Sequence, residues 1–292
     1  MNESAARRPD EEGRPRRFVR WTRANLAAGL GLVLLGLVVS LAVAGPMLHR
    51  VDPWERLGRR FEPPGSRFAL GTDHQGRDVL AGLAVGARTS LLVGLASAAV
   101  ILVIGVTIGT TAGYHGGLVD ETLMRVTEFF QILPAFLFAM VLVAIFSPTI
   151  WTIVVAIGVS NWAGTARLVR AEFLALRERD FVTAARALGV SDRRIMVREI
   201  LPNALPPVVV NASLTVGVAI LFEAGLSFLG LADPNVMSWG YMIGSSRIYL
   251  RDAWWTVTFP GLAIVASVLA LSLVGDWLND VLNPRVRGRR MA

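Results

Sequence analysis

Residues 129–166 read FFQILPAFLFAMVLVAIFSPTIWTIVVAIGVSNWAGTA, a run of 38 residues without a charged side chain. One helix needs only about 20 apolar residues to cross the hydrocarbon core of a bilayer. The run is interrupted at Ser147-Pro148-Thr149, where proline between small polar residues favours a turn. We therefore predict two membrane-spanning helices joined by a tight turn within this single stretch.

Other charge-free stretches surround this run, and each is long enough to span a bilayer as a helix. Because lipid offers no hydrogen bonds, a span must satisfy its own backbone groups, as a helix does. With 53% hydrophobic and 17% charged residues, the chain is predicted to be an all-α integral membrane protein with six transmembrane helices, and membrane lipid is its first partner. The further stretches are 26–48, 89–113, 201–222 and 253–275.

The distribution of arginine predicts the orientation. All 29 basic residues are Arg, and 20 of them lie before the first span, between spans 2 and 3, between spans 4 and 5, or after the last span. The positive-inside rule therefore places both termini in the cytoplasm. The first hydrophobic run of 23 residues is longer than the core of a signal peptide, so we expect an uncleaved anchor. The predicted organisation is a tail over 1–24, a first span over 25–48, an extracytoplasmic loop over 49–87, a core over 88–282 with a cytoplasmic loop at 167–200, and a tail over 283–292.

Composition also excludes several classes of function. The net charge is +7, but hydrophobic runs separate the basic residues, so no continuous surface for nucleic acid is expected. The chain has no Cys and only three dispersed His, which argues against disulfides, thiolate chemistry and a His- or Cys-based metal site.

The segment 180–189, DFVTAARALG, predicts a short amphipathic helix within the loop 167–200. Gly189 is placed to end this helix, and Ser191 to cap a second one that stops at Leu201-Pro202. The apolar stripe either packs on the protein's own bundle or docks into a groove of another protein. At the i, i+3, i+4 and i+7 positions of the stripe lie Phe181, Ala184, Ala185 and Leu188.

The same segment resembles a known signature. Ala184-Ala185, Gly189 and Leu201-Pro202 follow the AAxxxG…LP pattern of the cytoplasmic loop of ABC importer permeases. The resemblance implies a coupling helix seated in a cleft of the nucleotide-binding subunit. That motif typically begins with Glu, where this chain has Thr183. The contacts that the resemblance implies are made by Phe181, Thr183, Ala184, Ala185, Leu188 and Gly189.

Further motifs narrow the resemblance, over about residues 25–288, to the C-type permeases of dipeptide, oligopeptide and nickel importers. This implies the type I ABC importer permease fold, in the cell membrane of a bacterium. It also implies half of a translocation path for peptides, with nickel or glutathione as alternatives. The implied partners are a second, homologous permease, two ABC ATPase subunits or one fused ATPase, and an extracytoplasmic binding protein. The motifs are GTD at 71–73, GRD at 76–78, GARTSL at 86–91, GLSFLGL at 225–231, SWG at 238–240, FPG at 259–261, GD at 275–276 and NPR at 283–285.

Energy for transport must come from elsewhere. A phosphate-binding P-loop requires a Lys, and the chain has none. We therefore expect a non-catalytic subunit without a cofactor of its own, with ATP and Mg²⁺ on the partner ATPases.

An ion-coupled secondary transporter is the rival class. It predicts paired ionisable residues near the middle of the membrane. Glu223 and Asp276 are the candidates, and we interpret both as structural acids. In the outer loop, Asp73, Arg77 and Asp78 either contact the binding protein or pair within the loop.

Overall fold

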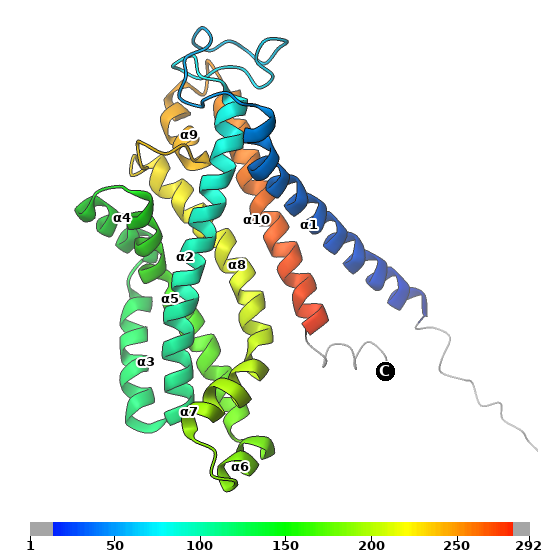
Figure 1. Ribbon diagram of the computed structural model, residues 1–292, viewed down its shortest axis with the longest axis vertical. Coiled ribbons are helices and arrows are strands. Elements are labelled where there is room, and N and C mark those ends of the chain that lie inside the picture. Colours follow the sequence, from blue (N-terminus) through cyan, green and yellow to red (C-terminus); the bar gives the residue numbers. More distant parts are fainter. Residues whose placement is uncertain (1–13, 283–292) are drawn as a thin grey trace, which may run out of the picture.

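A computed structural model describes residues 14–282 as a bundle of helices, without a β-strand among these residues (Figure 1). The bundle has a loop end, formed by residues 49–78 and α9, and an opposite α6 end. The helices are α1 (Arg14–Leu48), α2 (Val79–His115), α3 (Gly117–Ile132), α4 (Ala135–Phe146), α5 (Ile150–Arg177), α6 (Asp180–Ala187), α7 (Asp192–Arg194), the π-helical η1 (Ile195–Ile200), α8 (Leu201–Phe228), α9 (Trp239–Ser246), the 3₁₀ turn η2 (Arg247–Tyr249) and α10 (Trp255–Leu282).

Five helices are long and apolar enough to cross a membrane, and the bent pair α3–α4 raises the number to six if it counts as one span. The predicted turn at 147–149 is confirmed, since α4 ends at Phe146 and α5 begins at Ile150. The helix before that turn differs from the prediction, because the chain bends by 84° between α3 and α4. Pro134 lies at the bend and offers no N–H to continue α3.

Helices α2 and α5 pack along a seam of three glycines on α2. A methyl group added to Gly105 would lie 2.7 Å from Thr165 Cβ, and one added to Gly109 would lie 2.7 Å from Val169 Cβ. At Gly113 the distance to Phe173 Cβ would be 2.6 Å. Glycines four residues apart thus let the two backbones approach closely, as small residues do in membrane helix pairs.

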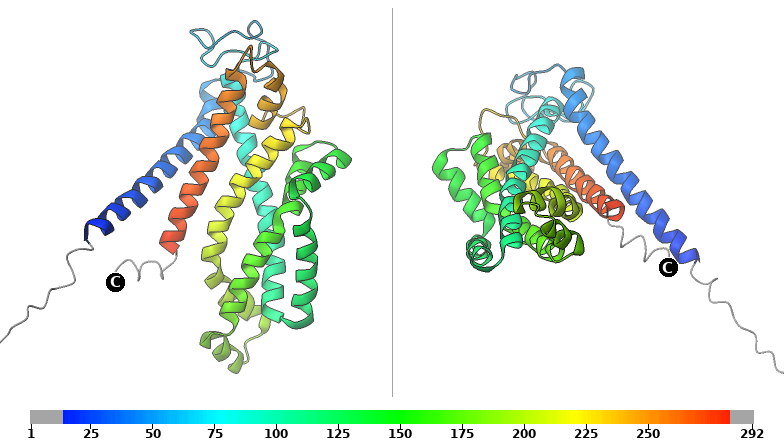
Figure 2. Two further views of the ribbon diagram at one scale, coloured as in Figure 1. Left: turned by 180° about the vertical axis from the view of Figure 1, so that it is seen from behind. Right: turned by 60° about the horizontal axis from the view of Figure 1, so that its bottom comes forward.

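Helix α1 meets α2 near the loop end and diverges from it further along, while it stays packed along α10, where Gly31 lies against Leu273 (Figure 2). Near the loop end, Arg88 Nε donates to the carbonyl oxygen of Ala42 at 2.5 Å, and Nη2 donates to that of Val43 at 3.0 Å. Pro46 lies four residues after Ala42 and has no N–H for its carbonyl, so Arg88 supplies the missing donor. Arg88 lies inside α2. This helix begins at Val79, so it includes the last nine residues of the predicted loop 49–87.

The predicted ends of the chain lie only partly within the structure. Helix α1 already begins at Arg14, so part of the predicted tail 1–24 continues the first helix. Residues 1–13 and the predicted tail 283–292, with its NPR motif, lie outside the described residues. Helix α1 runs toward the loop end and α10 runs away from it, so the start of α1 and the end of α10 both lie on the side away from residues 49–78 (Figures 1 and 2).

The expected stop at Leu201-Pro202 is wrong. The chain runs from Asp192 to Phe228 as one helical segment of 37 residues. Pro202 would collide with the carbonyl of a regular preceding turn. The π-helical η1 widens that turn, and Leu201 N–H bonds to the carbonyl of Met196, five residues earlier.

Candidate functional site

Helix α6 lies at the end of the bundle opposite residues 49–78, and one of its faces packs against the bundle (Figure 1). The side chain of Val182 is fully buried among Phe173, Ile195 and Ile200, and Ala185 is partly buried beside them. The stripe predicted from the sequence therefore differs from the observed inward face. It omitted Val182, the residue that anchors the helix.

The outward face of α6 carries the rest of the predicted stripe. Leu188 is 83% exposed and Phe181 is 38% exposed, and Ala184 between them is also exposed. Thr183 is exposed as well. Self-packing through Val182 and Ala185 thus leaves a separate apolar patch, Phe181, Ala184 and Leu188, without a partner in the described chain.

Gly189 ends α6 as the sequence predicts. Its φ of +74° is in the left-handed region. Gly189 N–H donates to the Arg186 carbonyl, and Val190 N–H donates to the Ala185 carbonyl, both near 3 Å. This pair of bonds is the Schellman arrangement, and it fixes the direction in which the chain turns back. Ser191 precedes α7 without a side-chain capping bond.

A polar group holds α6 and α7 against the end of α2. Tyr114 Oη donates to Asp192 Oδ1 at 2.5 Å, and the Arg186 guanidinium lies 5.5 Å from the Tyr114 ring centre. The cation–π contact and the hydrogen bond reach the two short helices from one side chain of α2. They limit the freedom of α6 relative to the spans.

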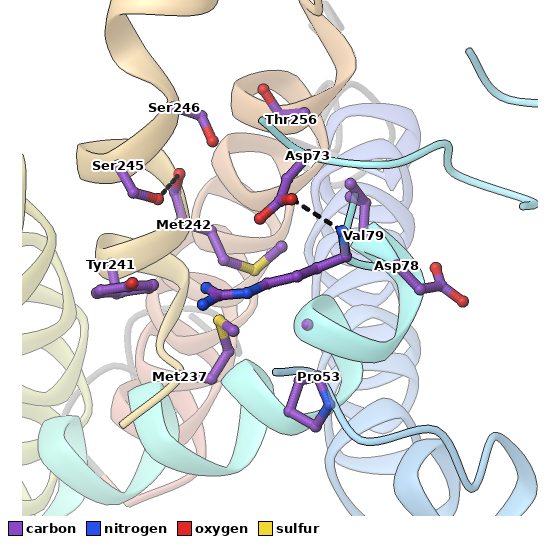
Figure 3. A pocket seen from close by; sticks show the side chains of 12 residues that line it. Pro53, Asp73, Asp78, Val79, Met237, Tyr241, Met242, Ser245, Ser246 and Thr256 are labelled. Atoms are coloured by element: carbon purple, nitrogen blue, oxygen red, sulfur yellow. Dashed lines mark hydrogen bonds between the residues drawn. The ribbon is translucent and has the colours of Figure 1, made fainter. Parts of the chain in front are cut away.

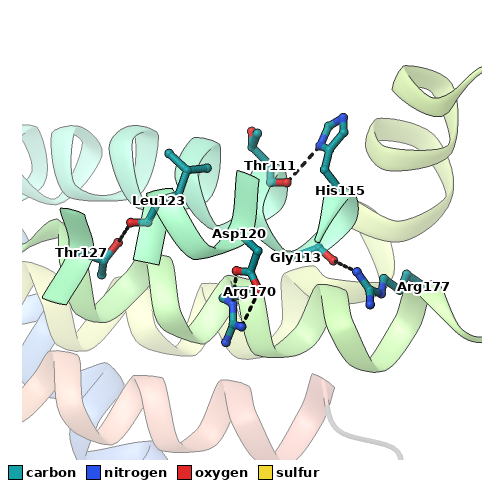
Figure 4. Close-up of polar contacts among 8 residues, drawn as sticks. All are labelled: Thr111, Gly113, His115, Asp120, Leu123, Thr127, Arg170 and Arg177. Carbon is teal, nitrogen blue, oxygen red and sulfur yellow. Dashed lines mark hydrogen bonds and ion pairs between the residues drawn. The ribbon is translucent and has the colours of Figure 1, made fainter. Parts of the chain in front are cut away.

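A second polar group ties the α2–α3 turn to α5 (Figure 4). Arg170 Nε and Nη2 donate to the two carboxylate oxygens of Asp120 at 2.5 and 2.6 Å. Arg177 Nη1 donates to the Gly113 carbonyl at 3.1 Å. A two-bonded pair of this kind fixes both the position and the orientation of the two side chains. The end of α5 that precedes α6 is therefore held against α2 and α3.

At the loop end, the three charged residues singled out from the sequence make contacts within residues 49–80, and Figure 3 shows two of them, Asp73 and Asp78. Asp78 is only 5% exposed, caps α2 by accepting from Leu80 N–H at 2.8 Å, and bonds to His49 Nε2 at 2.7 Å. Asp73 Oδ1 accepts from the backbone N–H of Arg77 at 2.9 Å. The Arg77 guanidinium lies 4.6 Å from the ring centre of Trp54. These contacts favour pairing within the loop over a contact with a binding protein.

A small cavity of about 20 Å³ lies beside these residues, between α2, α9 and α10. That volume suits one water molecule. Arg77 Nε, which is buried and lacks a hydrogen-bond partner among the described atoms, lines it together with Asp73, Ser245 and Thr256. The cavity is too small for a transported solute.

Glu223 joins α8 to α9. Its carboxyl group is 3% exposed, and Oε1 accepts from Ser227 Oγ at 2.8 Å and from Ser238 Oγ at 2.7 Å. Gly240 lies so close that an added methyl group would be 2.8 Å from both carboxyl oxygens. The arrangement agrees with a structural acid that holds the SWG segment in place.

Asp276 does not pair with Glu223. It is exposed on α10 next to Gly275, which abuts Ser213 of α8. Glu223 lies ten residues further along α8, about 15 Å higher at the rise of a helix. Among residues 14–282, no group of three or more His, Cys, Asp or Glu residues could hold a metal ion.

The fold and these sites define a helical membrane permease subunit, with an exposed apolar patch at one end and a hydrogen-bonded loop at the other. The chain belongs to the family of binding-protein-dependent transport system inner membrane components, whose pattern matches residues 105–288. It is therefore a transport subunit of the ABC importer class rather than a catalytic one.

Several curated relatives align over most of the chain. A putative peptide transport system permease protein of Brucella suis is 42% identical over 260 residues, 88% of each chain. The di/tripeptide transport system permease protein DppC of Pseudomonas aeruginosa is 40% identical over 272 residues, covering 90% of this chain and 89% of that protein. The oligopeptide transport system permease protein OppC of Bacillus subtilis is 35% identical over 267 residues, covering 91% and 88%.

A solved structure confirms the predicted type I importer fold. A chain of the MetNI methionine ABC transporter, in an inward-facing conformation, superposes with a TM-score of 0.54 at 19% identity. The match covers 69% of this chain and 96% of that one.

Proposed function

We propose that this chain forms half of the translocation path of an ATP-driven importer and that α6 is the point where the ATPase engages it. The observation that carries the proposal is the division of α6 into two faces. Val182 and Ala185 fix the helix to the spans, while Phe181, Ala184 and Leu188 remain exposed at the tip. A force applied to that patch passes into α5 and the 192–228 segment, because both flank the short helix.

The proposed assembly contains a second, homologous permease and two ABC ATPase subunits, or one fused ATPase, which carry the ATP and Mg²⁺. A binding protein delivers the solute at the loop end. This assignment makes the loop end extracytoplasmic and the α6 end cytoplasmic, with both termini in the cytoplasm. The excess of Arg near the α6 end supports that orientation.

Peptides are the proposed solutes. The support is the naming of relatives at 35–42% identity, which are peptide, di/tripeptide and oligopeptide permeases. Nickel and glutathione are the alternatives. Uptake of labelled dipeptides and tripeptides into vesicles, in competition with nickel and glutathione, separates them.

A pair of matched substitutions tests the docking patch. Leu188→Glu places a charge in the patch, and Leu118→Glu places one at a site of equal exposure, 82% against 83%, at the start of α3. We expect Leu188→Glu to abolish ATPase co-purification and uptake while the melting temperature stays unchanged. Leu118→Glu should retain both activities. Loss of folding in Leu188→Glu would instead assign the patch to self-packing, and normal uptake would remove α6 as the docking site.

The energy source has its own test. Uptake should stop when ATP is depleted and should persist when a protonophore collapses the ion gradient. Uptake that survives ATP depletion but stops with the protonophore would favour an ion-coupled transporter. Such a transporter needs paired ionisable residues, and Glu223 and Asp276 do not form a pair.

A further inference from the structure

Two grooves meet at Arg88 on the membrane-facing side of α2. The first, about 550 Å³, lies between α1 and α2, and the second, about 390 Å³, lies between α2, the start of α5 and the α8–α9 connection. Arg88 and Leu92 line both grooves, so they form one continuous depression. Its volume falls within the range of sites for small organic molecules.

The first groove is almost entirely apolar. Apart from Arg88, only aliphatic side chains line it, and several are exposed, with Leu92 at 48% and Leu95 at 59%. They follow α2 away from the loop end, toward the middle of the bilayer. The lining residues are Ala42, Val43, Arg88, Leu91, Leu92, Leu95 and Ala96.

The second groove lies at the depth of the membrane–water interface. Trp151, which is 67% exposed, lines it together with Thr149 and Asp233. Exposed Trp is typical of the headgroup region. The depression therefore begins at the polar surface of the bilayer and continues into its hydrocarbon region, as a phospholipid does.

The two charges in the second groove have opposite sign, and neither forms an ion pair with a side chain described between residues 26 and 282. Arg88 uses Nε and Nη2 for the α1 carbonyls, which leaves Nη1 without a partner in this range. Asp233 accepts only backbone N–H groups, from Ile150 at 3.1 Å and from Asn235 at 3.0 Å. Opposite charges attract more strongly where lipid excludes water, and this groove offers a place for one counter-charge of each sign.

We propose that this depression binds a phospholipid with a primary ammonium headgroup. The phosphate lies at Arg88 Nη1, the ammonium lies at Asp233, and one acyl chain follows Leu91, Leu92 and Leu95 between α1 and α2. The guanidinium suits a phosphate as a planar hydrogen-bond donor. The lipid fills the space left where α1 diverges from α2. It thereby supports the contact that Arg88 makes with the end of α1.

A photocrosslinking experiment tests the proposal in the membrane. The full chain carries p-benzoylphenylalanine in place of Leu95, or in place of Leu262 as a control at equal exposure, 58% on α10. After irradiation in vesicles of equal parts dioleoyl-phosphatidylethanolamine and dioleoyl-phosphatidylglycerol, intact-mass analysis counts each adduct. We expect the ethanolamine lipid to be enriched about two- to fivefold at position 95, the effect of a partly exposed ion pair, and not at position 262.

Two further variants assign the charges. Asp233→Asn should remove the enrichment but keep the adduct yield, because the phosphate site remains. Arg88→Gln should lower the yield of both lipids. The same photoreactive chain, irradiated in cells with its partner subunits, should also yield a lipid adduct. A polypeptide adduct at position 95 would assign the groove to a partner subunit and overturn the proposal, as would equal labelling by both lipids.

Discussion

The glycine seam between α2 and α5 gives the sharpest prediction for folding. In Gly109→Ala, the new methyl group would lie 2.5 Å from the Ala166 carbonyl oxygen and 2.7 Å from Val169 Cβ. Normal carbon contacts are about 3.5–4.0 Å, so the helices must separate by about 1 Å. Overpacking of this kind costs about 1–3 kcal/mol, and the gain in helix propensity from Gly to Ala offsets about 1 kcal/mol. We expect a net loss of about 0–2 kcal/mol relative to the parent, and a loss of about 1–3 kcal/mol relative to a Gly→Ala variant without the collision.

Gly164→Ala is the matched control. Gly164 lies on α5, one position before a seam residue, but nothing lies within 4 Å of an added methyl group there. Gly164→Ala gains the same helix propensity without a steric collision, so the stability of this variant should equal or exceed that of the parent. Both variants are compared by thermal unfolding in detergent, followed by the fluorescence of a dye or by loss of monodisperse protein. If Gly109→Ala is as stable as Gly164→Ala, the close approach of α2 and α5 is not what stabilises the bundle.

Two more predictions concern the ends of the bundle. Gly189→Ala should lower stability and uptake, since its φ of +74° costs a residue with a Cβ about 1–2 kcal/mol, and Gly189→Asn should lose less in both assays. Burial lowers the pKa of His74 below its usual 6.5, with Arg77 and Arg60 adding to the effect and Asp73 opposing it. The unfolded loop therefore takes up the proton first, and the stability of residues 49–78, complete above about pH 6.5, is lost as the pH falls. Proteolysis of that loop should be faster at about pH 5 than at about pH 7.5, and His74→Asn should remove the difference.

The spans could be predicted because charge is excluded from lipid along the whole of a spanning helix. Their details could not, because they depend on neighbours. After the bend at Pro134, Phe136 packs against Phe222 of α8, with 5.6 Å between the ring centres. Phe222 lies 86 positions later in the sequence, so local sequence does not reveal this contact. The loop was predicted to continue to residue 87, yet α2 begins at Val79, and its Arg88 is held by the carbonyl oxygens of Ala42 and Val43 on α1.

The candidate docking helix was located by its spacing and its Gly, but its faces were assigned incorrectly. Hydrophobicity cannot distinguish Val182, which packs inward, from Phe181, which points outward, since both are apolar and adjacent. The acidic residues of the loop 49–78 likewise show that residue type does not reveal the direction of a side chain. Asp73 and Asp78 are charged residues of the kind expected on a binding surface. Their hydrogen bonds with Arg77 N–H, Leu80 N–H and His49 show that they face inward.

The two faces of α6 are subject to different physical constraints. Val182 must match the inner surface of its own chain, so changes there require compensating changes in the bundle. Phe181, Ala184 and Leu188 are exposed, so their size and shape are less restricted by the bundle. They can change together with a partner while folding is preserved. Under the proposed function, three positions of one short helix would match the permease to its ATPase, which makes them the starting point for engineering hybrid transporters.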